Sequence, residues 1–330
     1  MPTLVTGGTG FVGGAIVAAL RARGEAVRVL ARTTSRTASL EALGVEITRG
    51  DILDRASLDR AMAGCDRLYH AAAMYAFWVP DRVLLMRTEV EGTRNVLEAA
   101  RSHGVSRVVY TSTGMAIGEA RGTVGDETTV HRGYFNTAYE EAKYRAERVV
   151  DDYAAGGFPV VIVSPGGVYG PGGVTPSVSA VVSAANGTLP AMIPGALSMV
   201  YVGDVAAGHL RAMDVGRPGE RYILSHETMD AAEFVGRACD LAGVERPPVL
   251  PLPVARVVAL LAEAGARLTG RQPVVARDTI EMLAHGLRLD GSKAVRELGV
   301  RYTSYDEGMR AGLRWYWEQG LLRRKPAFIV

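Results

Sequence analysis

Short apolar runs alternate with helix-like stretches through the first half of the chain. Leu4–Val5 is apolar, and Val108–Val109 is β-branched within a run that is typical of a buried strand. Helices are predicted between the strands, for example at Thr88–His103, which ends before Gly104. Strands and helices that alternate at this spacing indicate an α/β protein with a Rossmann-type, doubly wound parallel sheet. Further strands are predicted at Val27–Ala31, Val45–Ile52, Leu68–Ala73 and Tyr222–Leu224.

The alternation loosens after about Gly172, which divides the chain into two regions. Residues 1–171 carry the predicted sheet, and residues 172–330 form a smaller region from which some segments return to that sheet. Within the second region a helix is predicted at residues 254–269, the most lipid-like segment of the chain. Because three charged residues interrupt it (Arg256, Glu263 and Arg267), we expect a helix packed against the protein rather than a membrane span.

A glycine-rich turn joins the first predicted strand to the first predicted helix. Gly8, Gly10 and Gly13 fit G-x-G-x-x-G, and Gly7, Gly10 and Gly13 also fit G-x-x-G-x-x-G. Glycine permits the tight turn and lets the backbone approach a pyrophosphate, which the N–H groups and positive dipole end of the helix favour. The alternative is a glycine-rich turn in an ordinary α/β protein. The predicted dinucleotide site consists of Gly7, Gly10, Phe11, Val12 and Gly13.

The ends of the second and third predicted strands bear on which dinucleotide binds. A cofactor with free ribose hydroxyls is usually met by an acid after the second strand, whereas this chain has Arg32, then three hydroxyl residues and Arg36. A guanidinium and hydroxyls suit a 2′-phosphate, so the pattern favours NADP(H), with NAD(H) or a solvated basic loop as alternatives. Asp51 and Ile52 are candidates to contact the adenine; the alternative makes Asp51 a turn cap and Ile52 a core residue.

Small residues end the fourth predicted strand. Ala71, Ala72 and Ala73 leave room at a carboxyl strand end, where ligands of open α/β sheets bind. We assign a structural role to His70, which lies inside the strand. The aromatic stretch that follows either lines a substrate pocket or packs as an ordinary loop; it contains Tyr75, Phe77 and Trp78.

A phenol and an amine follow the fifth predicted strand, which ends in Thr111-Ser112-Thr113. Tyr139 and Lys143 lie one turn apart on one face of a predicted helix. A free tyrosine has a pKa near ~10, and lowering it by about 3 units takes roughly 4 kcal/mol. An ammonium ~4 Å from the phenolate supplies about that much at an effective dielectric of ~20. We therefore predict an acid–base pair; for the pair alone, the alternative is a half-exposed tyrosine beside a solvated lysine.

Taken together, these motifs resemble those of the extended short-chain dehydrogenases/reductases, and the resemblance covers nearly the whole chain. The matching segments are Thr6–Gly13, Gly50–Ile52, His70–Ala73, Thr111–Thr113, Tyr139-x-x-x-Lys143 and Pro165–Pro171. Within that family the chain is most similar to dihydroflavonol-reductase-like proteins and to the hopanoid-associated sugar epimerase group. The segments that carry this further similarity are Gly64–Asp66, Val90–Val96 and Gly219–Leu224.

The resemblance implies roles for particular residues. Tyr139 would be the general acid/base, Lys143 would hold the ribose and lower the tyrosine pKa, and Thr113 would be the catalytic hydroxyl, with Ser112 as the other candidate. The family also implies a homodimer formed by the helices that contain Gly92–Ala100 and Tyr139–Val150, and a C-terminal substrate lid. Further residues would border the cofactor: Thr111, Pro165, Gly166 and Val168.

The chain departs from the family pattern at several positions. Glu89 replaces the asparagine that relatives usually carry before Val-x-Gly-Thr. Ser164 and Gly167 replace an arginine and an asparagine of nucleotide-sugar enzymes, which weakens a nucleotide-sugar interpretation. Thr113 is followed by Gly114-Met115 rather than by the Asp-Glu pair of sugar dehydratases.

Composition narrows the class of partners. Across 330 residues, 37 basic and 35 acidic residues give a formal charge of +2, which offers no electrostatic argument for nucleic acid or an anionic membrane. Two cysteines, Cys65 and Cys239, imply no disulfide framework. The start, Met1-Pro2-Thr3, lacks a charged leader, so we expect a cytoplasmic protein. We expect a small-molecule substrate and no metal site, nucleic acid or membrane partner.

The sequence thus predicts an NADP(H)-preferring oxidoreductase that moves a hydride between the nicotinamide and a carbonyl or secondary alcohol of a small, hydrophobic substrate. One alternative is an NAD(P)-dependent (nucleotide-)sugar epimerase, which would show no net cofactor turnover. A second is a non-catalytic dinucleotide-binding sensor or scaffold. The presence of Thr113, Tyr139 and Lys143 argues against the sensor, whereas Glu89 leaves room for it.

Overall fold

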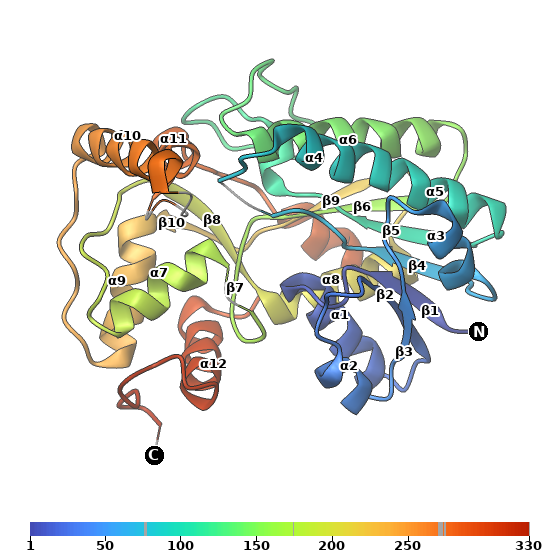
Figure 1. Ribbon diagram of the computed structural model, residues 1–330, viewed down its shortest axis with the longest axis horizontal. Coiled ribbons are helices and arrows are strands. Elements are labelled where there is room, and N and C mark those ends of the chain that lie inside the picture. Colours follow the sequence, from blue (N-terminus) through green and yellow to red (C-terminus); the bar gives the residue numbers. More distant parts are fainter. Residues whose placement is uncertain (76–77, 174, 270–272, 274, 330) are drawn as a thin grey trace.

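The computed structural model describes residues 1–75, 78–173, 175–269, 273 and 275–329. Within these residues seven parallel strands form the main sheet, in the order β3-β2-β1-β4-β5-β6-β9 (Figure 1). The predicted Rossmann-type sheet is therefore confirmed. The strands are β1 (Thr3–Thr6), β2 (Val27–Ala31), β3 (Glu46–Arg49), β4 (Arg67–His70), β5 (Arg107–Thr111), β6 (Val160–Pro165) and β9 (Arg221–Leu224).

Helices cover both faces of this sheet because successive strand residues point to opposite sides. Val5 of β1 belongs to a core shared with α1 (Phe11–Ala22) and α8 (Val202–Val215). Its neighbour Leu4 belongs to a second core, which lies on the other face. The helices of that second layer are α3 (Arg55–Met62), α5 (Gly92–Ser102) and α6 (Ala138–Ala155).

The strand order reverses between β1 and β4, and ligands of open α/β sheets bind in the crevice at such a point. The turn after β1 contains the glycines, and the segment after β4 begins with Ala71. The next strand along the sheet, β5, ends at Thr111, which directly precedes Ser112 and Thr113. The topology therefore brings the predicted cofactor and hydroxyl residues to one edge of the sheet.

The helix predicted at Thr88–His103 is irregular in its first part. A short helix α4 (Arg82–Met86) passes into a π-helical turn, η1 (Arg87–Glu91), and then into α5. A π turn places one additional residue in a helical turn and is frequent at functional sites. Glu89 lies in this turn and is only 2% exposed, although carboxylates are rarely buried without a partner.

The C-terminal region is organised around a three-stranded sheet and an aromatic core. Strand β8 (Ala196–Tyr201) pairs with β7 (Gly167–Tyr169) in parallel and with β10 (Glu227–Asp230) in antiparallel fashion. The rings of Tyr169, Phe234 and Tyr305 pack against one another in its core. The other elements are α2 (Ala38–Ala42), η2 (Gly114–Ile117), α7 (Pro176–Ala185), α9 (Ala231–Ala242), α11 (Arg277–His285), η3 (Ala294–Leu298) and α12 (Tyr305–Glu318).

The lipid-like segment forms α10 (Leu252–Thr269), so the predicted helix is confirmed. The helix packs through mostly small residues, and its large apolar side chains face outward. The buried positions are Ala255, Ala259, Glu263 and Ala266. Among the described residues, no helix combines the length and the apolar character that crossing a membrane requires.

Candidate active site

Backbone geometry fixes the glycines after β1. Gly7 has φ +73°, and a Cβ there would lie 2.5 Å from the backbone of Ala71 and Ala72. A Cβ on Gly13 would lie 2.2 Å from the Gly7 carbonyl oxygen, and the Gly10 N–H donates to that same oxygen at 2.9 Å. Any larger residue at position 7 or 13 would therefore push strand, turn and helix apart.

The N-terminus of α1 suits a bound anion. Gly10 is the N-cap residue, no side chain caps the helix, and its first turn contains no acidic residue. The first N–H groups of a helix need acceptors from outside it, and the helix dipole favours a negative charge there. The chain therefore fits the pyrophosphate of a dinucleotide, which Phe11, Val12 and Gly13 would hold through their N–H groups.

The basic loop after β2 is exposed and is held in place by an arginine that the sequence analysis missed. Arg49, at the end of β3, donates to the carbonyl oxygens of Arg32 (3.0 Å) and Ser35 (3.1 Å) and to the Thr37 hydroxyl (2.7 Å). Within the described part of the chain, the Arg32 and Arg36 side chains have no hydrogen bond or ion pair. Both guanidinium groups are thus available to an external anion.

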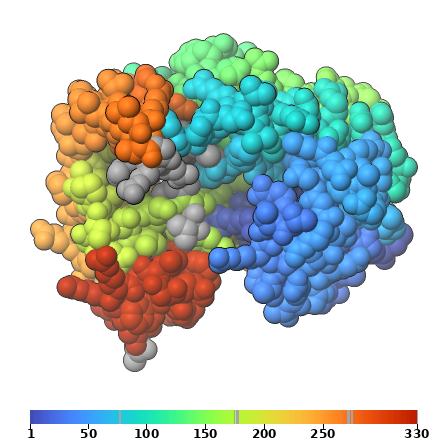
Figure 2. Space-filling model, viewed as in Figure 1, coloured from blue at the N-terminus to red at the C-terminus, as the bar shows by residue number. Residues whose placement is uncertain are grey.

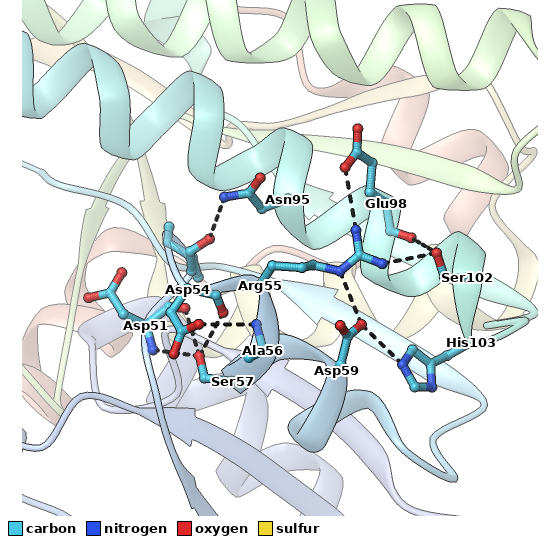
Figure 3. Close-up of polar contacts among 11 residues, drawn as sticks. Asp51, Asp54, Arg55, Ala56, Ser57, Asp59, Asn95, Glu98, Ser102 and His103 are labelled. Atoms are coloured by element: carbon cyan, nitrogen blue, oxygen red, sulfur yellow. Dashed lines mark hydrogen bonds and ion pairs between the residues drawn. The ribbon is translucent and has the colours of Figure 1, made fainter.

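Asp51 and Ile52 have the contacts of a turn and of the core. Asp51 accepts from the Leu53 N–H at 2.9 Å through Oδ1. Its backbone N–H donates to the Ser57 hydroxyl at 3.0 Å (Figure 3). Ile52 is 8% exposed and packs in the core beneath α3 and α5. A Cβ on Gly92 would lie 2.6 Å from its Cδ1. Asp51 thus caps the turn, and Ile52 is a core residue. Asp51 remains partly accessible, and its second carboxylate oxygen has no bond within the described residues.

Figure 3 also shows how α3 is tied to α5. Arg55 donates to Asp59 at 3.0 Å and to Ser102 at 3.0 Å, and it forms an ion pair with Glu98 at 3.4 Å. The Arg55 hydrogen bond holds the pKa of the exposed Asp59 carboxyl below its usual value. This network holds the C-terminal part of α5 against α3.

His70 is a buried structural residue rather than an acid or base. Its Nδ1 lies 2.8 Å from the Thr6 hydroxyl, and its Nε2 lies 3.2 Å from the Thr93 hydroxyl. Burial, helped by the nearby Lys143 charge, lowers the pKa of His70 to about 3. The imidazole therefore stays neutral and ties β1, β4 and α5 together. Beyond it, the Ala71 N–H still donates to the Thr6 carbonyl at 3.1 Å, while Ala72 is half-buried and Ala73 exposed.

Tyr139 and Lys143 lie in the first two turns of α6, whose N-terminus Thr137 caps by accepting from the Glu140 N–H. Both are buried, at 5% and 1% exposed. The Lys143 ammonium donates to the Tyr110 hydroxyl at 3.0 Å and to the Thr111 carbonyl at 2.9 Å. Tyr110 was not predicted from the sequence, because a contact across 33 positions leaves no local pattern.

Glu89 supplies the negative charge opposite Lys143. Its Oε2 lies 3.4 Å from the Lys143 Nζ, and its Oε1 accepts from the Met74 N–H. Both side chains are 1% exposed, so this is a buried ion pair. The residue that departs from the family pattern therefore contacts the candidate catalytic lysine directly, and it also fixes the backbone after β4.

The acidity of Tyr139 differs from the simple expectation of a phenol acidified by Lys143. Burial raises the pKa of Tyr139; the Lys143 ammonium opposes that shift, and the Glu89 carboxylate reinforces it. Burial by itself would lower the pKa of Lys143, but Tyr110, Glu89 and Tyr139 outweigh it and the pKa is raised. Lys143 is thus a persistent cation, and Tyr139 holds its proton well above neutral pH.

The hydroxyls after β5 have separate roles. Ser112 is buried and donates to the Glu147 carboxylate, so its proton is already committed. Thr113 is half-buried and caps η2, accepting from the Met115 N–H at 3.4 Å. The Thr111 hydroxyl pairs with His209 at 2.9 Å. Of the two candidates named from the sequence, Thr113 is the one whose hydroxyl proton is left for a ligand.

The remaining predicted residues lie around β6 and the loop after β4. Pro165 ends β6 and is buried, whereas Gly166 and Val168 are half-buried. A Cβ on Gly166 would lie 2.5 Å from the Ser198 carbonyl oxygen, so this glycine lets β6 meet the smaller sheet. In the loop after β4, the Tyr75 ring meets the Tyr139 ring edge-on at 5.1 Å and Trp78 packs on the C-terminal core. Phe77 lies outside the described residues.

Comparison with known proteins defines the class. The profile of the NAD dependent epimerase/dehydratase family matches residues 3–225. The chain therefore belongs to this family of extended short-chain dehydrogenases/reductases, as the motifs predicted.

Several curated relatives have names that refer to reductions or to lipid-like molecules. A Synechocystis protein with a dihydroflavonol 4-reductase name is 35% identical, with 97% of this chain and 95% of the relative covered. Sterol demethylase protein B of Methylococcus capsulatus is 37% identical over 98% of this chain and 100% of its own. A Stigmatella aurantiaca ketoreductase, named for a farnesylated dihydroquinoline oxide, is 31% identical over 91% of each chain.

Solved structures agree on the fold. The crystal structure of gox2253 has 36% sequence identity and a TM-score of 0.86, and it covers 98% of this chain and 99% of that one. A nucleoside-diphosphate-sugar epimerase from Pseudomonas aeruginosa has 25% identity and a TM-score of 0.80 over 98% and 99% of the two chains.

Proposed function

We propose that this protein is an NADP(H)-preferring oxidoreductase that interconverts a ketone and a secondary alcohol on a small hydrophobic substrate. The observation that carries the proposal is the buried pair of Tyr139 and Lys143, one turn apart at the start of α6. Lys143 is fastened to the end of β5, beside the point where the sheet offers a ligand crevice.

The chain's own residues would handle the proton. A bound nicotinamide supplies or accepts a hydride. Tyr139 would donate its phenolic proton to the substrate oxygen as charge develops there, and the Lys143 ammonium would stabilise the phenolate left behind. The Thr113 hydroxyl would orient the same substrate oxygen. Because burial raises the pKa of Tyr139, the phenol carries the proton that carbonyl reduction would take up.

The coenzyme preference rests on the loop after β2. Arg32 lies where an acid would favour a free ribose, and its guanidinium has no bond within the described part of the chain. Arg49 holds the loop by its backbone and so leaves the Arg32 side chain to reach a 2′-phosphate. These features support NADP(H), while the family name refers to NAD.

The substrate class rests on the apolar character of the C-terminal region and on the relatives. Residues of α7, β8 and α9 pack into an apolar, partly aromatic core. Relatives in which most of the chain is matched carry names that refer to sterol and farnesylated molecules. Both support a hydrophobic carbonyl compound rather than a sugar diphosphate.

A sugar epimerase remains the second candidate because a structural neighbour carries that name. Ser164 and Gly167 argue against it, because they remove an arginine and an asparagine typical of nucleotide-sugar enzymes. A non-catalytic sensor is disfavoured by the intact Tyr139 and Lys143.

A homodimer is the proposed assembly. An open groove of about 580 Å³ lies on the outer face of η1, α5 and α6. Apolar and aromatic side chains line it together with arginines, and a second copy would cover them. The lining includes Met86, Val90, Phe135, Tyr144, Arg145 and Val149.

The buried, unpaired thiols of Cys65 and Cys239 support a cytoplasmic location.

A panel of carbonyl compounds tests the function. Purified protein is given NADPH or NADH with sterol, aryl and alkyl ketones, and in parallel with nucleotide sugars, while nicotinamide absorbance is followed. The proposal expects NADPH to be consumed with a hydrophobic ketone. If no ketone causes NADPH or NADH to be consumed and a nucleotide sugar is interconverted, the protein is an epimerase instead. If NADH is used better than NADPH, the proposed coenzyme preference is wrong, and the proposed reductase activity is unaffected.

A further inference from the structure

Helix α10 exposes the side chains that a surface helix normally buries. Six large apolar residues of this helix are between 44% and 89% exposed. A surface helix of a globular protein usually turns its apolar stripe to the core and its polar face to water. In α10 the apolar side chains face the solvent instead. An exposed apolar face of this kind indicates an apolar partner. The exposed residues are Val254, Val257, Val258, Leu260, Leu261 and Leu268.

The exposed residues form one face rather than a scatter. At about 100° per residue they fall within an arc of roughly 160°, and the centre of that arc lies opposite the buried seam. The seam that contacts the protein contains Ala255, Ala259 and Ala266, whose small side chains let α10 lie close to α11. The outward face is thus as well defined as the inward one.

The charges of α10 select the kind of partner. Arg256 and Arg267 lie about 20° apart in projection, along one edge of the apolar face. The helix has one acid, Glu263, which is buried and accepts from the Arg277 N–H at 2.7 Å. Arg256 is held by Glu281 of α11 at 2.9 Å, and Arg267 has no hydrogen bond or ion pair within the described residues. An apolar face flanked by the free Arg267 guanidinium is complementary to the boundary region of an anionic phospholipid layer.

We propose that α10 docks this protein, reversibly, on an anionic lipid surface, with its axis parallel to the surface and its apolar face inserted. A second copy fits less well, because an antiparallel contact through this face would place the two arginine edges side by side. The nearly balanced overall charge provides no long-range attraction to a membrane. The docking surface is a local feature, and it revises the expectation of no membrane partner.

The position of α10 gives the docking a consequence. The orange surface of α10 and α11 lies at the outer edge of the C-terminal half in this view (Figure 2). Asp278 of α11 accepts from the Ala138 N–H at 3.4 Å, one residue before Tyr139. Docking would therefore place at the lipid boundary a helix pair that contacts the start of α6.

Vesicle flotation with the full chain tests the proposal without any substrate, so its failure is separate from failure of the proposed reductase activity. We expect the protein to float with vesicles of phosphatidylcholine and phosphatidylglycerol, and less with phosphatidylcholine alone. The triple variant Val257→Gln, Leu261→Gln, Leu268→Gln should bind about 100-fold more weakly. Arg267→Gln should remove part of the anionic preference. All four positions are exposed, so folding should be retained.

A matched control changes two other exposed valines, Val124→Gln and Val130→Gln, which are 62% and 89% exposed outside α10. This variant should float like the wild type. The proposal is overturned if the wild type stays unbound with both kinds of vesicle, or if the triple variant binds unchanged. Loss of an oligomer in the triple variant without vesicle binding by the wild type would assign the face to a second copy.

Discussion

The residue types in the two halves of this molecule are restricted in different ways. Around β1 the residue type follows from backbone geometry: a Cβ on Gly13 would lie 2.2 Å from the Gly7 oxygen, and one on Gly7 would meet the backbone beyond β4. In the C-terminal half, Tyr169, Phe234 and Tyr305 fill a volume by packing ring against ring. Backbone constraints admit one residue type, whereas a packed volume admits many combinations.

This difference separates what such a protein shares with its family from what is its own. The glycine turn and the Tyr139–Lys143 pair carry the cofactor and proton chemistry proposed above, and they belong to the half built on the seven-stranded sheet. The substrate region is built from interchangeable apolar residues, and its amino-acid pattern carries little information on the molecule it receives. Glu89 stands between these cases, since it lies on the regular half but belongs to this chain rather than to the family pattern.

Tyr139→Phe should have the largest effect, because it removes the proton donor while leaving the nucleotide half intact. General acid–base groups contribute about 100- to 10,000-fold, so turnover should fall by that factor. Dinucleotide affinity, measured by fluorescence titration, should change by less than about threefold. Tyr153→Phe, near the other end of the same helix and outside the proposed dimer groove, is the control and should retain activity. Near-normal turnover in the Tyr139→Phe variant would show that the phenol is not the acid.

Gly13→Ala should disturb the turn after β1, where the backbone leaves no space for a side chain. Its Cβ has no space beside the Gly7 oxygen, so dinucleotide affinity should fall by about 100-fold and stability by about 1–3 kcal/mol. Calorimetry and cofactor titration measure both. Gly14→Ala is the matched control, since the nearest atom to its Cβ would be 3.5 Å away. If both variants keep the dinucleotide affinity and the stability of the wild type, the backbone around β1 does not restrict the residue type. The difference drawn between the two halves would then be wrong.

Glu89→Gln should change the pH dependence of the proposed reaction. Glu89 raises the pKa of Tyr139, so replacing its carboxylate with an amide lowers that pKa. Alcohol oxidation needs the phenolate, and its rate rises with pH until Tyr139 is deprotonated. The rising limb of kcat/KM should therefore move to lower pH, by about one unit. The amide oxygen can still accept from the Met74 N–H, which favours retention of the fold.

Two further variants separate this charge effect from a structural one. Glu89→Asp retains the charge and should restore most of the wild-type profile. Glu91→Gln removes an exposed carboxylate that pairs with Arg87 in the same helical turn, and it should leave the profile unchanged. An unshifted limb in Glu89→Gln with normal melting would mean that Glu89 only supports the fold.

Arg32→Ala should have the smallest effect, since the side chain is exposed and contributes one contact to the coenzyme. The ratio of kcat/KM for NADPH to that for NADH should fall by about tenfold, through loss of a charge-assisted contact to the 2′-phosphate. Arg36→Ala, in the same loop, serves as the comparison and should change the ratio less. An unchanged ratio in Arg32→Ala would place coenzyme selection elsewhere.

The sequence predicts the nucleotide half well because its constraints are local. The strands, the glycine turn and the one-turn spacing of Tyr139 and Lys143 are all visible within a few residues. The Lys143–Tyr110 bond and the Arg49 contacts were missed, since they join positions that only the fold brings together. The outward face of α10 was missed for a related reason: helical periodicity gives the faces of a helix, but not which face is turned to the protein.

The fate of deuterium tests the central claim most directly. The protein is given NADPH in which both hydrogens of the reactive ring carbon are deuterium, with the hydrophobic ketone found in the panel, and product and cofactor are analysed by mass spectrometry. One deuterium on the new carbinol carbon is expected for each NADP⁺ formed, and Tyr139→Phe should form about 100- to 10,000-fold less of this deuterated alcohol in the same time. No net cofactor oxidation, with inversion at a sugar carbon instead, would contradict it.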